Sequence, residues 1–185
     1  MDLGRENNLT ERELVRLVSD GDARGQRELY DRYAGYLTAV ASRYLSDSDA
    51  VKDLLQEAFI RVFNRFGSFH YRGEGSLKAW LTRIVVNDSL HILRQTRHLL
   101  PVDTLPDSPD EDPDVDNVPL GVLQEMIRRL PDGYRTVFNL YVFEQMKHKE
   151  IASLLGIKEN SSASQFLRAK ALLAQEIKEY RKNNG

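Results

Sequence analysis

The chain has 185 residues, of which 41% are hydrophobic and 29% charged, with a net charge of −2 and no cysteine. This length suffices for one medium-sized domain or two small ones, and the hydrophobic fraction excludes a disordered protein. No apolar run reaches the ~20 residues of a membrane helix, and the first residues lack the apolar core of a secretory signal. The lack of cysteine excludes disulfides and thiolate metal sites and fits a reducing cytoplasm.

The first hundred residues predict four helices. Thr10 and Glu13 form a capping-box pattern at the start of the first helix. The second carries an apolar face at spacings of three and four, formed by Leu29, Tyr33, Leu37, Val40 and Tyr44. The third spans 49–66, and the fourth spans 76–98 after a glycine-rich loop at 67–75.

The charge is distributed unevenly along the chain. Residues 101–119 contain five prolines, seven carboxylates and no basic residue, which gives this segment a net charge of −7. The segments before and after it carry +1 and +4. Such a composition forms neither a helix nor a core, so it predicts a linker at 99–119 between domains at 1–98 and 120–185.

The C-terminal segment predicts four more helices, at 120–130, 133–144, 148–155 and 161–182. A short helix, a glycine at its end (Gly156), a brief turn and a longer basic helix are typical of a helix-turn-helix. The predicted fold class is therefore all-α, with two helical domains joined by an acidic, proline-rich linker.

The last helix has the residues of a DNA-recognition helix. Its predicted buried face consists of Phe166, Ala169, Leu172 and Leu173. The serine hydroxyls suit phosphates, while Gln165 and Arg168 suit adenine and guanine edges. The candidate contacts with duplex DNA are Ser161, Ser162, Ser164, Gln165, Arg168 and Lys170. From the pattern alone, a plain helical hairpin with a solvated polar face explains them equally well.

Longer stretches resemble the extracytoplasmic-function (ECF) branch of the bacterial RNA polymerase sigma factors. The C-terminal resemblance lies in RRLPDGYRTVFNLYVFEQMKHKEIASLLGIKENSSASQFLRAKALL, residues 128–173. The N-terminal resemblance lies in LYDRYAGYLTAVASRYL, DAVKDLLQEAFIRVF and KAWLTRIVVNDSLHILR, in that order. Two resemblances in the family's order, separated by a linker, indicate an alternative sigma factor.

The resemblance implies two surfaces in the N-terminal domain. The first would dock on core RNA polymerase through Asp53, Gln56 and Glu57. The second would hold the unpaired bases of the opened minus-ten element through Phe69, His70, Arg83, Asn87 and Arg94. Trp80 lies at helical spacing from Leu77, Leu81 and Ile84, and we interpret it as a core anchor instead.

In the C-terminal domain, the resemblance implies that Ser161, Ser164, Gln165 and Arg168 read the minus-thirty-five element as a duplex. The chain has Asn160-Ser161-Ser162 where the family often has Gly-Thr-Val. The acidic linker either mimics RNA phosphates in the polymerase's RNA channel or serves only as a soluble spacer, and both readings remain open.

The expected function is promoter recognition, DNA opening and transcription initiation together with core RNA polymerase. The implied partners are core RNA polymerase, promoter DNA and an anti-sigma factor. No sequence pattern indicates an enzyme, a cofactor, a metal site or a small-molecule substrate. The alternatives are a stand-alone helix-turn-helix regulator that binds operator DNA without polymerase, and a protein-interaction adaptor.

Overall fold

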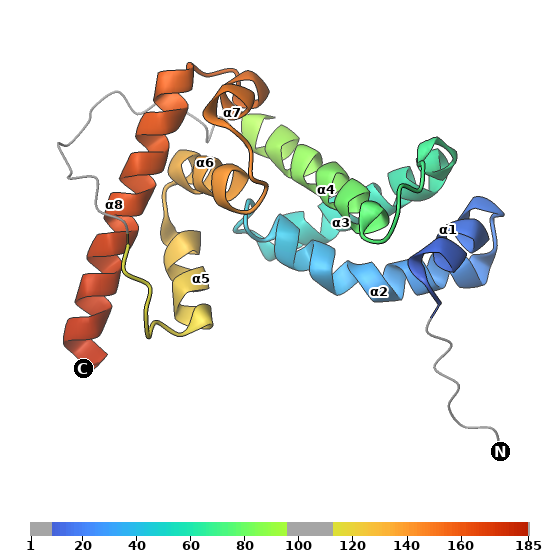
Figure 1. Cartoon of the computed structure of the whole chain (residues 1–185), viewed down its shortest axis with the longest axis horizontal. Coiled ribbons are helices and arrows are strands. Elements are labelled where there is room, and N and C mark those ends of the chain that lie inside the picture. Colours follow the sequence, from blue (N-terminus) through green and yellow to red (C-terminus); the bar gives the residue numbers. More distant parts are fainter. Residues whose placement is uncertain (1–8, 96–112, 185) are drawn as a thin grey trace. The chain divides into compact units, whose positions relative to one another are not determined.

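The computed structural model describes residues 9–95 and 113–184, and the secondary structure in these ranges is entirely helical (Figure 1). The predicted all-helical class is therefore confirmed. By proximity, the chain forms two compact units, Met1–Ser89 and Leu90–Gly185. The two proposed roles of the acidic linker concern a segment that lies largely outside the described residues.

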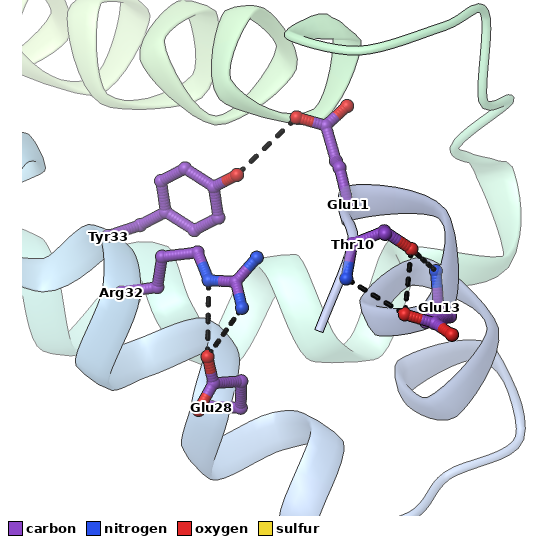
Figure 2. Close-up of polar contacts among 6 residues, drawn as sticks. All are labelled: Thr10, Glu11, Glu13, Glu28, Arg32 and Tyr33. Atoms are coloured by element: carbon purple, nitrogen blue, oxygen red, sulfur yellow. Dashed lines mark hydrogen bonds and ion pairs between the residues drawn. The ribbon is translucent and has the colours of Figure 1, made fainter. Parts of the chain in front are cut away.

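The first unit contains α1 (Glu11–Ser19), α2 (Ala23–Ala41), α3 (Ser48–Arg65), the short 3₁₀ turn η1 (Phe66–Ser68) and most of α4 (Ser76–Gln95). Side chains cap the first three helices, since the first amides of a helix lack partners within it. At α1, the Thr10 amide donates to Glu13 Oε2 at 2.9 Å, and the Glu13 amide donates to Thr10 Oγ1 at 3.2 Å (Figure 2). The predicted capping box is confirmed.

Helices α1 and α2 pack at very close range where Gly25 lies. A Cβ atom at this position would stand 2.6 Å from Leu17 Cβ and 3.0 Å from backbone atoms of α1. Because real Cβ atoms essentially never approach that closely, only glycine allows this spacing. Gly25 therefore allows α1 to pack directly against the start of α2.

The core of the first unit follows the predicted periodicity. The residues of the predicted apolar face, from Leu29 to Tyr44, are all buried, although α2 ends at Ala41 and Tyr44 therefore lies beyond the helix. Helix α4 adds Leu77, Leu81 and Val85 at spacings of four. A hydrogen bond also joins α4 to α2, since Tyr36 Oη lies 3.2 Å from Thr82 Oγ1.

The second unit contains α5 (Leu120–Arg129), α6 (Asp132–Val142), α7 (His148–Leu155) and α8 (Glu159–Asn184). These bounds lie within two residues of the predicted ones. Its core joins α5, α6 and α8 through Met126, Ile127, Leu130, Tyr134, Ala169, Leu173 and Ile177. The buried Arg135 donates to the backbone oxygens of Arg128 at 2.9 Å and Leu130 at 3.1 Å, which satisfies the end of α5.

Candidate nucleic-acid interface

Helix α4 presents a continuous polar stripe to solvent. Arg83, Asn87 and Arg94 are all exposed, and their spacings of four and seven place them on one face. The exposed His91 falls on the same face, and its Nε2 atom lies 3.0 Å from Gln95 Nε2. The apolar residues opposite fix this orientation. Cations and an amide in a row suit a strand of nucleic acid.

The loop before α4 is held by a group of three aromatic rings. The Phe69 ring centroid lies 5.1 Å from Trp80 and 5.8 Å from Phe66, and Phe66 meets Trp80 edge-on at 5.8 Å. Phe69 and Trp80 are both half-buried. Trp80 therefore packs with the loop that precedes its helix, while the next loop residue, His70, is exposed.

A second exposed face lies on α3. Asp53, Gln56 and Glu57 are all exposed at spacings of three and four. Ile60, seven residues after Asp53, shares this face and is 61% exposed. Sequence reasoning missed Ile60, although its position outside the helix's apolar stripe was a usable signal. An exposed isoleucine beside carboxylates suits a protein partner.

Arg61 connects this face of α3 to α4. Its Nη1 atom lies 3.4 Å from Glu57 Oε2, and its Nη2 atom lies 2.5 Å from Asp88 Oδ2. Partial burial disfavours the cation, but the hydrogen bonds to Asp88 and Glu57 outweigh this effect and raise the pKa of Arg61. The guanidinium thus fixes α3 relative to α4, next to Asn87.

In the second unit, α7 and α8 form the predicted helix-turn-helix. Gly156 ends α7 with φ of +69°, a left-handed conformation that glycine adopts without strain. The Ile157 amide donates to the Ala152 carbonyl at 3.1 Å, which closes the turn. Helix α8 then starts at Glu159.

The buried face of α8 differs from the predicted one. Ser162, Gln165 and Arg168 are buried, whereas Leu172 is 37% exposed. Ser162 Oγ lies 3.0 Å from His148 Nδ1 on α7, and Arg168 Nη1 donates to Tyr134 Oη on α6 at 3.3 Å. The assignment of Leu172 to the buried face was therefore wrong. The predicted DNA contacts of the three polar residues stay predictions.

The other predicted residues of α8 are more accessible. Ser161, Ser164 and Lys170 are half-buried, and Lys170 Nζ lies 5.8 Å from the centre of the Phe166 ring. Sequence reasoning missed the exposed Lys147 and Lys158, which flank α7, and the exposed Lys149 in its first turn. Their gathering within twelve residues around a turn was the available signal.

The described residues hold neither a cluster of metal-binding side chains nor a helix that could span a membrane. Among residues 9–95 and 113–184, no group of three metal-binding side chains gathers where an ion could be held. No helix in these ranges is both long and apolar enough to cross a membrane.

Comparison with known proteins gives matches for both parts of the chain. The family model of sigma-70 region 2 matches residues 29–98, and that of sigma-70 region 4 matches residues 120–173. The ECF RNA polymerase sigma-E factor of Haemophilus influenzae is 27% identical, over 91% of this chain and 96% of its own length. The sigma-E factor of Escherichia coli K12 is also 27% identical, over 91% and 95%.

A further relative and one solved structure agree with these matches. The RNA polymerase sigma-H factor of Pseudomonas aeruginosa is 25% identical, over 86% of this chain and 90% of its own length. The structure of CnrH in complex with the cytosolic domain of CnrY matches with a TM-score of 0.52 and 21% identity, over 91% of this chain and 97% of that chain. This last likeness concerns the fold alone.

Proposed function

We propose that this chain, which belongs to the ECF branch of the sigma-70 family, starts transcription as an alternative sigma factor. It binds core RNA polymerase, recognises two promoter elements and opens the DNA, without catalysing a reaction itself. The observation that carries this proposal is that region 2 and region 4 occur in one chain, in that order.

The proposed domains are residues 1–98 for core and minus-ten binding, 99–119 as the linker, and 120–185 for the minus-thirty-five element. The spans of the two family matches, 29–98 and 120–173, support this division. The linker's net charge of −7 suits either an RNA mimic or a soluble spacer, and the proposal includes both roles.

For DNA opening, we propose that the stripe of α4 holds the separated strand. Arg83 and Arg94 would neutralise phosphates, and the Asn87 amide would bond a base edge. His70, exposed in the loop, would contact the captured base, and Phe69 would support it from the aromatic group. Such contacts offset the few kcal/mol that unstacking one base requires.

For the duplex element, we propose a division of roles along α8. Ser161 and Ser164 would contact the DNA backbone, since hydroxyls and amides near a helix start suit phosphates, and the Lys170 ammonium would pair with a phosphate farther along the helix. Ser162, Gln165 and Arg168 are buried, so base contacts by Gln165 and Arg168 would require their side chains to turn outward. Until then, Ser162 and Arg168 hold α8 against α7 and α6.

For core binding, we propose the face of α3 formed by Asp53, Gln56, Glu57 and Ile60. Carboxylates would pair with basic side chains of the polymerase, and Ile60 would be buried in the contact. We also propose a cytoplasmic location and an anti-sigma protein as a further partner, as the family resemblance implies.

The test is run-off transcription with purified core polymerase on genomic fragments, with and without the protein. We expect discrete new transcripts that appear only when it is present. If the protein binds duplex operator DNA tightly without polymerase, it is a stand-alone regulator. If it binds polymerase but adds no promoter, it is an adaptor. Either result would overturn the proposal.

A further inference from the structure

A buried carboxylate joins the first helix to the start of α4. Glu11, at the first position of α1, is only 3% exposed. Its Oε1 atom accepts from the Leu77 amide at 3.0 Å and from Ser76 Oγ at 3.4 Å. Its Oε2 atom accepts from the Gly75 amide at 3.0 Å and from Tyr33 Oη at 3.4 Å, and Figure 2 shows Glu11 directed toward Tyr33 of α2.

The two backbone amides are among the four that the beginning of α4 leaves without helical partners. Gly75 and Leu77 stand on either side of Ser76, where α4 begins. A side-chain acceptor is normally supplied by a residue within the same helix start. Here the acceptor comes from a residue more than sixty positions earlier, so the cap of α4 also closes the loop onto α1.

Helix α1 touches the same loop at a second place. The guanidinium carbon of Arg12 lies 5.3 Å from the centre of the Tyr71 ring. Helix α1 also lies against the turn η1, which begins the loop. The adjacent residues Arg12 and Glu11 thus contact the middle and the end of the loop that runs from Phe66 to Ser76. Helix α1 precedes the segment matched to region 2, which begins at residue 29.

We propose that Glu11 is a positioning residue for promoter opening, which fixes the shape of the loop that carries Phe69 and His70. This inference rests on the proposed function, because the loop matters only if it captures a base. Glu11 itself contacts no DNA in this proposal. It acts by holding the loop's end and the first turn of α4 in one arrangement before DNA arrives.

The chemistry requires a carboxylate at this position. The Gly75 amide, the Leu77 amide and the Tyr33 hydroxyl donate to Glu11, and a carboxylate offers acceptors on both oxygens. The single proton of the Ser76 hydroxyl has a nearer acceptor, the Gly73 carbonyl at 2.6 Å. A glutamine would replace one oxygen by an NH₂ group, which would face the Gly75 amide or the Leu77 amide as donor against donor. One buried amide would then be unsatisfied, and the loop would open to find another partner.

The experiment compares Glu11→Gln with Glu13→Gln in the full-length protein bound to core polymerase. Glu13 is exposed, lies two residues away, and belongs to a capping box that glutamine also satisfies. Permanganate reactivity of unpaired thymines measures opening of a promoter that the wild-type protein opens. Because a misplacement of about 1 Å lowers rates by up to ~100-fold, we expect E11Q to slow opening by about tenfold or more. We expect E13Q to stay within about twofold of wild type.

Two further measurements separate positioning from general damage. Affinity for core polymerase should remain within about twofold for E11Q, since α3 is untouched. Amide hydrogen exchange at Gly75 and Leu77 should become faster in E11Q and not in E13Q. Equal opening by E11Q and wild type, or a parallel loss of core binding, would overturn the inference.

Tyr33→Phe provides the second variant. It removes the link from Glu11 to α2 and leaves the two amides of the loop bonded. We expect Y33F to open the promoter within about twofold of wild type. If Y33F is as slow as E11Q, Glu11 only ties α1 to α2, and the proposed positioning role is wrong. Failure of the wild-type protein to open any promoter would instead contradict the proposed function itself.

Discussion

The polar face of α4 and the polar start of α8 have the same kind of composition but differ in burial. On α4, Arg83, Asn87 and Arg94 are exposed as their spacing predicts. On α8, Gln165 and Arg168 are buried, although they were predicted to face outward. The difference shows that polar side chains indicate the exposed face of a helix only where apolar residues occupy its buried face.

The apolar residues of each helix explain this contrast. Helix α4 carries Leu77, Leu81 and Val85 at intervals of four, so its phase is fixed from the first turn. On α8, the residues four and eight positions before the buried Leu173 are Ala169 and Gln165, which are also buried. The inner face of its first three turns therefore includes polar residues, of which Ser162 bonds to α7 and Arg168 to α6.

The largest predicted effect tests the phase of α8. Leu173→Ala should lower the free energy of unfolding by about 2–5 kcal/mol, because it empties a fully packed position. Leu172→Ala removes a side chain that is partly exposed and should lower it by less than about 1 kcal/mol. Urea unfolding followed by circular dichroism measures both. Equal losses, or a larger loss for Leu172→Ala, would contradict the observed face.

A second substitution compares one arginine from each region. Arg168→Ala should destabilise the protein by about 1–3 kcal/mol, because the Tyr134 hydroxyl loses a buried partner. Arg83→Ala, on the exposed stripe, should change stability by no more than about 0.5 kcal/mol. The same unfolding assay decides, and a neutral Arg168→Ala would contradict a packing role for this residue.

The reverse comparison concerns DNA. Asn87→Ala should weaken binding of the polymerase complex to a partly single-stranded promoter fragment by roughly fivefold to tenfold, since one hydrogen bond contributes about 1 kcal/mol. Stability should stay unchanged. Arg16→Ala, an exposed substitution on α1, is the control for both measurements. Unaltered binding by Asn87→Ala would remove this residue from the proposed interface.

The smallest predicted effect is a dependence of the first unit on pH. Asp22 caps α2, and its hydrogen bonds to the Arg24 side chain and amide lower the pKa of Asp22 to about 2 from 3.8. A carboxyl with a lowered pKa stabilises the fold above its unfolded pKa, and this contribution is lost as the pH falls from about 4 to 2. Asp22→Asn should reduce that dependence while keeping a cap, as unfolding measured across this pH range would show. An unchanged dependence in Asp22→Asn would assign the titration to another carboxyl.

The presence and order of the helices were predictable from the sequence, because the spacing of apolar residues, the capping residues and the residues that end helices all act locally. The capping box at Thr10 and the end of α7 at Gly156 are examples. The burial of Ser162 was not predictable in this way, since it depends on His148, fourteen residues earlier. The role of Glu11 was equally hidden, because its partners at Gly75 and Leu77 are backbone amides, which leave no trace in a side-chain pattern.

The most direct test of the central claim is site-specific photo-cross-linking in the complete polymerase–promoter complex. One cross-linker would replace His91, on the stripe of α4, and another would replace Asn160, exposed at the start of α8. We predict adducts of the first with the opened region near the start site and of the second with duplex DNA farther upstream, both only when core polymerase is present. Adducts at one common position, or equal adducts without polymerase, would contradict the account.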